Sequence, residues 1–209
     1  MKKMFFAVAI LVQCAVFAQV NTPIVLRVDY GFSNVRTQSG RGTGAAALGL
    51  GIEGFLKLKS TKMGAAITLN PHLSYLGTGY EASSGGDVRV KYLSLNMPIS
   101  YVSGNINNYS GMAVIIGVGP FVSVATSGKF QVAQGDAFKK MSFGNSSSDN
   151  RKTLDAGWVL KTGFKMKKTY FGMQFNYGLS NVIPADRISN GNYIKTRNIL
   201  FYLGYQINK

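Results

Sequence analysis

The only histidine of the chain, His72, stands among hydroxyl and amide side chains that could support acyl transfer. Thr68, Asn70 and Ser74 lie two or four residues away, so on an extended strand all four side chains share one face. A histidine base can activate a serine when a third group orients it, but no Gly-x-Ser-x-Gly element presents such a serine. We predict a histidine satisfied inside the protein and no catalytic residue. An outer-leaflet lipid-modifying enzyme centred on His72 is the alternative.

Two further patterns could in principle bind phosphate or metal. The glycine run at residues 40–44 is similar to a phosphate loop, but neither a Lys-Ser pair nor a helical pattern follows it. Asp87, Asp136 and Asp149 fall in separate loops without the spacing of a calcium site. The sequence therefore predicts no cofactor and no metal.

The best candidate for recognition is a long Ser- and Gly-containing segment, residues 127–152. It combines aromatic residues with five cations, which are Lys129, Lys139, Lys140, Arg151 and Lys152. Cations close to a bilayer can form charge-assisted hydrogen bonds with lipopolysaccharide phosphates, or they can contact a protein partner. A loop whose charges only keep it solvated is an equally good interpretation.

The first residues have the order of a secretory signal peptide. Met1-Lys2-Lys3 precedes an apolar run at residues 4–12, and small residues lead to a predicted cleavage site after Ala18. Cleavage removes Cys14, the only cysteine, which excludes disulfides, thiolate metal sites and cysteine catalysis in the mature chain. Lipidation of Cys14 is disfavoured because the bulky Gln13 precedes it. We expect residues 1–18 to be the signal and residues 19–209 to form one domain.

The chain is strongly basic, with a formal net charge of +15, of which Lys2 and Lys3 contribute two charges. In an exported protein this charge favours outer-membrane lipid or lipopolysaccharide as a partner, and no nucleic acid is expected. The alternative is that lysines at turns only keep the ends of a membrane protein in water.

Period-two alternation recurs in segments of about ten residues rich in aromatic and β-branched side chains, as in transmembrane β-strands. No run is long enough for a transmembrane helix. Pro71 and Pro98 are tolerable only at bulges or weak pairing positions. Eight strands are predicted, at residues 24–32, 45–58, 65–76, 88–102, 112–126, 153–166, 171–179 and 199–207.

One face of these strands is apolar, and the other carries polar, charged or small residues. Residues 112–126 are the exception, because they are apolar on both sides and their facing stays open. The charged face is a poor lining for an apolar cavity and suits a filled, hydrogen-bonded lumen. We therefore favour a membrane barrel over a secreted soluble β-barrel that carries a ligand. The predicted lumen-facing ionisable residues are Arg27, Asp29, Glu53, Lys57, His72, Asp155 and Lys161.

The connections alternate in length along the chain. Short ones follow the second, fourth and sixth strands, and longer ones rich in Gly, Ser and Asn follow the others. Short periplasmic turns alternating with long outer loops are typical of an outer-membrane barrel with both termini in the periplasm. The predicted fold is all-β: a closed antiparallel up-and-down transmembrane β-barrel of eight strands. At that size side chains fill the interior, so no open pore is expected.

Four segments resemble, in order, the PorT-like outer-membrane β-barrel family of Bacteroidota. They are Tyr92-Leu93-Ser94-Leu95-Asn96-Met97-Pro98, Gly117-Val118-Gly119-Pro120-Phe121 with Ser127-Gly128-Lys129, Asp155-Ala156-Gly157-Trp158 through Gly163-Phe164, and Tyr177-Gly178-Leu179-Ser180-Asn181-Val182. The resemblance implies a cell outer membrane location and a structural, adhesion or secretion-associated role, for some members in type IX secretion. A secretion-machinery or cell-surface protein would then be a partner, and no enzyme activity is expected.

Overall fold

The computed structural model describes residues 22–38, 40–41, 43–60, 65–81, 85–104, 111–188 and 192–208. The predicted signal peptide lies outside these residues. None of the described helices is long and apolar enough to cross a membrane. The elements, in chain order, are β1 (Ile24–Thr37), β2 (Gly40–Arg41), β3 (Thr43–Gly54), β4 (Leu56–Ser60), β5 (Ala66–Leu69), β6 (His72–Glu81), β7 (Asp87–Asn96), β8 (Ile99–Ser103), β9 (Met112–Phe130), β10 (Lys139–Lys140), β11 (Leu154–Met166), β12 (Thr169–Gly178), η1 (Ala185–Arg187) and β13 (Ile194–Gln206).

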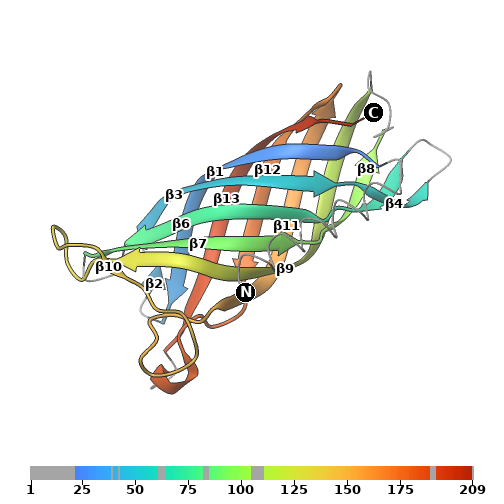
Figure 1. Cartoon of the computed structure of the whole chain (residues 1–209). Helices are drawn as coiled ribbons and strands as arrows, with labels where there is room; N and C mark the ends of the chain where they lie inside the picture. The colour runs from blue at the N-terminus through green and yellow to red at the C-terminus, as the bar shows by residue number, and fades with distance from the viewer. Residues whose placement is uncertain are drawn as a thin grey trace.

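Eight long strands form a closed ring of antiparallel pairs, in the order β1, β3, β6, β7, β9, β11, β12, β13 and back to β1 (Figure 1). The seam joins the first strand to the last over thirteen residue pairs, from Val25 opposite Gln206 to Thr37 opposite Ile194. Each long strand therefore has a hydrogen-bonded neighbour on both sides. The predicted closed antiparallel barrel of eight strands is confirmed.

Three neighbouring strands of the barrel, β3, β6 and β7, are interrupted at nearly the same height. The short strands β4, β5 and β8 continue them beyond the breaks. The breaks fall at Phe55, Pro71 and Pro98. Backbone bonds across them keep the wall joined: Gly54 N donates to Pro71 O (3.0 Å) and Asn70 N donates to Pro98 O (2.9 Å). Both prolines thus occupy irregular positions, as predicted, because a proline cannot donate to the ladder.

Side-chain burial follows the predicted alternation around the ring. In β9 the structure resolves the facing that the sequence left open: Val114, Ile116 and Val118 point outward, while Ala113 and Ile115 are buried inside. Lys57, predicted to face the lumen, is instead exposed. The reason is that β1 pairs with β3 only as far as Gly54, so β4 extends past the edge of its neighbour into solvent.

The two ends of the barrel differ, but less than predicted. One end, here called the turn end, carries the connections 61–65, 104–111 and 167–168, and the other, the loop end, carries the two longest, 131–153 and 179–193. The prediction of long loops at 33–44 and 77–87 was wrong, because β1, β3, β6 and β7 extend into them and leave connections at 38–42 and 82–86 that are no longer than those of the turn end. Both ends of the described chain meet at the turn end, where Ile24 N donates to Asn208 Oδ1 (2.7 Å) and Asn208 Nδ2 donates to Thr22 O (2.6 Å). In Figure 1 the last residues of β13 accordingly lie at the same end of the barrel as β4 and β8, away from β10.

Candidate functional site

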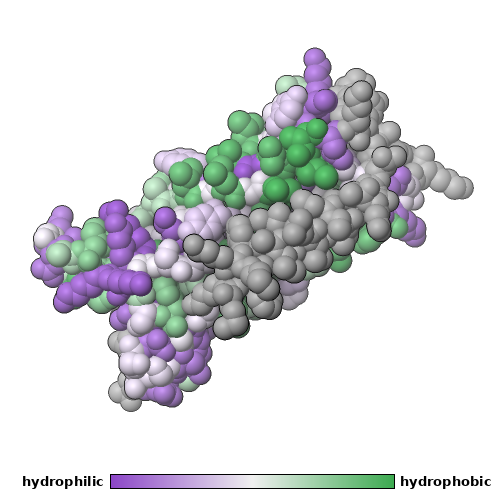
Figure 2. Space-filling view, in the orientation of Figure 1, coloured by the Kyte–Doolittle hydropathy of each residue, from purple (hydrophilic) through white to green (hydrophobic). Residues whose placement is uncertain are grey.

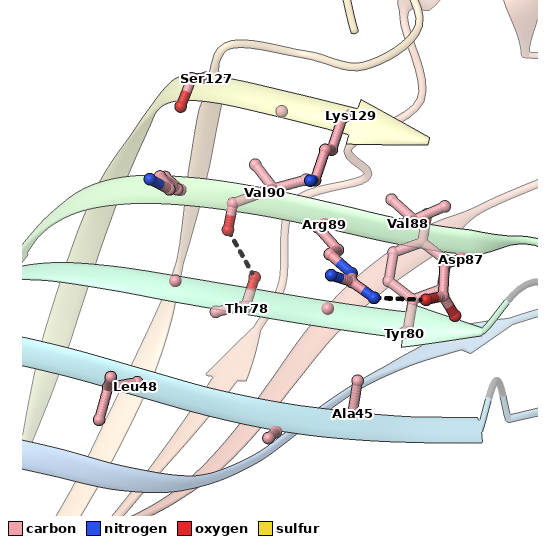
Figure 3. A pocket seen from close by; sticks show the side chains of 15 residues that line it. Ala45, Leu48, Thr78, Tyr80, Asp87, Val88, Arg89, Val90, Ser127 and Lys129 are labelled. Carbon is pink, nitrogen blue, oxygen red and sulfur yellow. Dashed lines mark hydrogen bonds and ion pairs between the residues drawn. The ribbon is translucent and has the colours of Figure 1, made fainter. Parts of the chain in front are cut away.

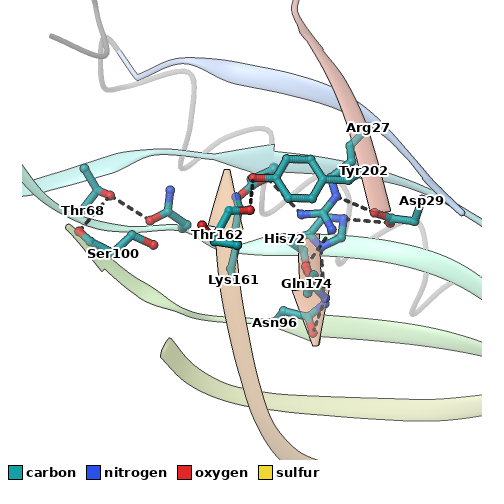
Figure 4. A network of polar contacts seen from close by, with 12 residues as sticks. Arg27, Asp29, Thr68, His72, Asn96, Ser100, Lys161, Thr162, Gln174 and Tyr202 are labelled. Carbon is teal, nitrogen blue, oxygen red and sulfur yellow. Dashed lines mark hydrogen bonds and ion pairs between the residues drawn. The ribbon is translucent and has the colours of Figure 1, made fainter. Parts of the chain in front are cut away.

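A cluster of ionic side chains fills the middle of the lumen, and Arg27 is its centre. Because side chains two apart on a strand point the same way, Arg27 and Asp29 of β1 both enter the interior. Arg27 Nε donates to Asp29 Oδ1 (2.6 Å), Nη1 to Glu53 Oε2 (3.3 Å) and Nη2 to Gln174 Oε1 (2.7 Å). The guanidinium also lies 4.0 Å from the centre of the Tyr202 ring. Figure 4 shows these side chains reaching inward from several strands.

The charges of this lumen cluster balance. Lys161 from β11 donates to Glu53, so two cations, Arg27 and Lys161, face two carboxylates, Asp29 and Glu53. All four side chains are at most 2% exposed. A buried charge without a partner is strongly unfavourable, whereas a paired and hydrogen-bonded set is tolerated. The cluster therefore fills the lumen with side chains of opposite charge that pair with one another, although Asp29 Oδ2 accepts no hydrogen bond from a described residue.

His72 lies at the edge of the lumen cluster and is 1% exposed. Its Nδ1 is 3.4 Å from Asn96 Nδ2, and its Nε2 is 3.7 Å from Asp29 Oδ2. The neighbouring hydroxyl of Thr68 donates to Asn70 Oδ1 (2.8 Å) and not to the histidine. Within the described part of the chain, no hydroxyl bonds to His72 Nε2. His72 is therefore packed inside the lumen between Asn96 and Asp29.

Apolar plugs close the lumen on either side of the ionic layer. At the turn end, Phe55 packs on Tyr170 with ring centres 5.2 Å apart, together with the buried Ile115 and Val102. At the loop end a second cluster contains Val88, Val90, Tyr92, Ala125 and Met141, with Phe143 packed against it. Met141 and Phe143 belong to the long loop between β9 and β11, so this loop folds back into the mouth. The barrel is thus filled at three levels.

The five cations predicted to contact lipid or a partner do not lie together on one surface. Lys129, Lys139 and Lys140 are exposed at the loop end, where Lys140 of β10 stands opposite Lys129 of β9. Arg151 is only 4% exposed, because it lies inside the mouth, 5.8 Å from the centres of both the Tyr80 and the Tyr92 rings.

Lys152 is half-buried, and its backbone N donates to Val182 O (2.8 Å). Arg151 and Lys152 therefore help to hold the loop in the mouth, whereas the three exposed lysines remain available to a ligand.

Two further cations join the exposed lysines, and the sequence prediction missed them. Arg89 and Lys91 of β7 point outward, and Arg89 stands directly opposite Lys129. Phe138 bridges them, with Arg89 Cζ 4.8 Å and Lys129 Nζ 4.4 Å from its ring centre. Arg89 and Lys91 lie four and two residues before Leu93 on the same strand. Because Leu93 faces outward and side chains alternate, the two cations face outward as well. We call the set Arg89, Lys91, Lys129, Lys139 and Lys140 the rim cluster.

Below the rim cluster the outer wall is apolar. Figure 2 shows hydrophobic side chains over the wall and hydrophilic ones at the end that carries β10. The outward apolar side chains run from Ile199 of β13 to Ile207, the residue after it, and span about the nine residues that a tilted strand needs to cross a bilayer. Large outward side chains that are more than 40% exposed include Leu26, Tyr30, Leu48, Leu50, Ile99, Tyr101, Ile116, Trp158, Leu160, Phe164, Phe171, Phe201 and Leu203. An apolar belt this extensive indicates a surface that contacts lipid.

Comparisons with known proteins found no matching family model and no matching curated protein. Among solved structures, the barrel is similar to the outer membrane enzyme PagL, with a TM-score of 0.48 and 11% identity over 86% of this chain and 99% of that one. It is also similar to Neisserial surface protein A, with a TM-score of 0.47 and 9% identity over 88% and 97% of the two chains.

A third similar structure is Ail, the attachment invasion locus protein of Yersinia pestis, with a TM-score of 0.44 and 11% identity over 90% of this chain and all of that one. Similarities of this degree do not assign a role or a family to this chain. Among the residues that the structure describes, no group of three or more His, Cys, Asp or Glu side chains is placed to hold a metal ion.

The balance of charge in the lumen cluster can be tested with a pair of variants. Lys161→Met leaves Arg27 alone against two buried carboxylates, and we expect it to lower the free energy of unfolding by about 3 kcal/mol or more. The double variant Glu53→Gln with Lys161→Met restores the balance and should be more stable than the single one. Urea unfolding of the detergent-solubilised barrel, followed by tryptophan fluorescence, measures both.

Lys57→Met is the control for the loss of one lysine, because Lys57 is exposed, and it should change stability by less than about 1 kcal/mol. A double variant as unstable as Lys161→Met would show that charge balance does not govern the lumen.

Proposed function

We propose that this chain is a small integral outer-membrane barrel with a structural, adhesion or secretion-associated role and without catalytic activity. The observation that carries the proposal is the combination of an apolar outer wall with a lumen filled by polar side chains, among which two cations pair with two carboxylates. A protein of this form offers its surroundings a rigid frame and a set of loops. The PorT-like segments named above support the secretion-associated form of the role.

The orientation is part of the same proposal. Both ends of the described chain lie at the turn end, and the two longest connections, 131–153 and 179–193, lie at the loop end. In outer-membrane barrels the short turns face the periplasm and the long loops face the exterior. We therefore place the rim cluster and the loop between β9 and β11 at the cell surface, and both termini in the periplasm.

The alternatives receive less support from the geometry. A soluble ligand carrier would need its large apolar side chains inside and polar ones outside, and the wall has the opposite arrangement. An enzyme centred on His72 would need a route for substrate, yet His72 lies beneath the apolar cluster at the loop end and is almost fully buried.

A filled lumen predicts that the protein does not conduct ions. We expect the refolded barrel, inserted into planar lipid bilayers, to give no steady conductance steps, because the central side chains leave almost no surface that water can reach. An open porin in the same bilayers provides the positive control. Stable steps whose size rises with salt concentration would contradict the closed lumen.

The proposed role of the loops predicts that they can be removed without harming the frame. Residues 132–140 are all exposed, whereas Met141, Phe143 and Arg151 close the mouth. Replacing 132–140 by a Gly-Ser linker of equal length should leave the heat-induced shift of the barrel on detergent gels unchanged. Assays of cell adhesion and of protein export should nevertheless give the phenotype of a strain that lacks the protein.

The control replaces Lys57 and Lys59 by serine at the turn end, which should preserve both the gel shift and the phenotype. A linker variant that restores wild-type adhesion and export to the strain that lacks the protein would contradict a role for this loop.

A further inference from the structure

A groove of about 700 Å³ lies on the outside of the barrel near the loop end. It runs across four neighbouring strands, β3, β6, β7 and β9 (Figure 3). Outward-facing positions on a strand normally carry side chains that cover the backbone, but here two successive ones on β6 are Gly77 and Gly79. Gly77 forms the floor beside Gly79, which is buried, and Ala46 and Leu48 of β3 form one side.

The backbone does not require a glycine at position 77. A Cβ added there would meet no atom closer than Leu48 O at 3.6 Å, which is an ordinary contact. The φ angle of Gly77 is also not positive. The space above it is therefore a feature of the surface and not a by-product of close strand packing.

The other side of the groove carries three members of the rim cluster. Arg89 stands opposite Gly79, and Lys91 stands opposite Gly77. On the next strand, Lys129 pairs with Arg89. Like charges directly opposite each other are unfavourable, and the Phe138 ring lies near both Arg89 and Lys129. The groove thus has three cations along one side.

The acidic groups near the groove neutralise this side only in part. Asp87 Oδ2 accepts from Arg89 Nη2 at 2.9 Å, with both side chains exposed. Glu81 stands opposite Asp87, farther from the apolar belt. Among the described residues, no carboxylate lies within ion-pair distance of Lys91 or Lys129. Positive charge therefore remains where the groove meets the wall.

The groove opens onto the apolar belt. Tyr75 is two residues from Gly77, Leu93 is two residues from Lys91, and the two stand opposite each other on the outer wall. Val124 continues the same row on β9. Tyr75 and Val124 are 42% and 38% exposed. A molecule with a phosphate among the cations could thus lay a hydrocarbon chain on the glycine floor and onward over the wall.

We propose that this groove binds a phosphorylated lipid of the leaflet at the loop end. Arg89, Lys91 and Lys129 hold the phosphate by charge-assisted hydrogen bonds, for which the arginine fork is well suited. Gly77 and Leu48 accept an acyl chain. A soluble anion would not need the apolar floor, and an uncharged lipid would not need the cations. The inference rests on the membrane location proposed above.

The experiment measures the affinity of the detergent-solubilised mature chain for diphosphoryl lipid A by titration in native mass spectrometry. Three variants change the groove. The first is a triple variant that combines Arg89→Gln, Lys91→Gln and Lys129→Gln. The other two are the single variants Gly77→Leu and Gly77→Ala. We expect the triple variant and Gly77→Leu each to weaken binding by roughly tenfold, and Gly77→Ala to weaken it less. Lipid A without its phosphates should bind the wild type as weakly as diphosphoryl lipid A binds the triple variant.

The control for loss of charge is Lys57→Gln with Lys59→Gln and Lys167→Gln, three exposed lysines at the turn end, which should keep wild-type affinity. The proposal is overturned if the triple variant binds no more weakly than this control. It is also overturned if inorganic phosphate competes and Gly77→Leu has no effect, which would indicate a site for free phosphate.

A dimer that dissociates in the triple variant would assign the groove to a second copy of the chain and equally overturn the proposal. Cell fractionation of the wild type separates these failures from a failure of the proposed membrane location. If the membrane location is wrong, the wild-type protein will be found outside the membrane fraction.

Discussion

The need to satisfy every backbone polar group in the absence of water governs this structure. In hydrocarbon an unpaired N–H or C=O group costs several kcal/mol, so a sheet that crosses a bilayer must have no open edge. The pairing of β1 with β13 meets that requirement by joining the ends of the sheet. Where prolines interrupt the ladder, aligned breaks with backbone bonds across them keep the wall closed. The β4 strand, which lacks β1 as a neighbour, lies beyond the paired wall and carries exposed lysines.

Closing the ring determines where polar side chains can go. Half of the positions on each strand face lipid and must be apolar, and the other half converge on a lumen too narrow to hold bulk water. Those inward groups must satisfy one another. The ion pairs of Arg27 and Lys161 with Asp29 and Glu53 do so for most of their polar atoms, and the apolar plugs at both ends keep water from competing. Because the lumen is filled, the charged side chains that a ligand can reach lie at the rim of the barrel.

Much of this arrangement could be predicted from the alternation of residue types. The number of strands, the outward facing of residues such as Leu203 and the inward facing of Arg27 all follow from a period of two, because that period is a property of the extended chain. The facing of β9 could not be predicted, since Ile115 is as apolar as Val114. It becomes clear only from the plug of Phe55 and Tyr170 that Ile115 completes.

The candidate site was predicted less well, because loops lack a period. Lys129, Lys139 and Lys140 are exposed as expected, but Arg151 turns into the mouth and stacks near Tyr80, a contact between residues 71 positions apart. Arg89 and Lys91 share the outward face of Leu93 and could have been assigned from alternation. Their closeness to Lys129 depends on the pairing register and on the bulge between β7 and β9, which the sequence does not display.

The most direct test of the account uses the single tryptophan. Trp158 lies on the outer wall of β11 and is 53% exposed. In vesicles that contain lipids with brominated acyl chains, we expect strong quenching of its fluorescence and weak quenching by aqueous iodide, because the wall contacts hydrocarbon. Efficient quenching by iodide with no effect of the brominated lipids would place the apolar wall in water and contradict a membrane-spanning barrel.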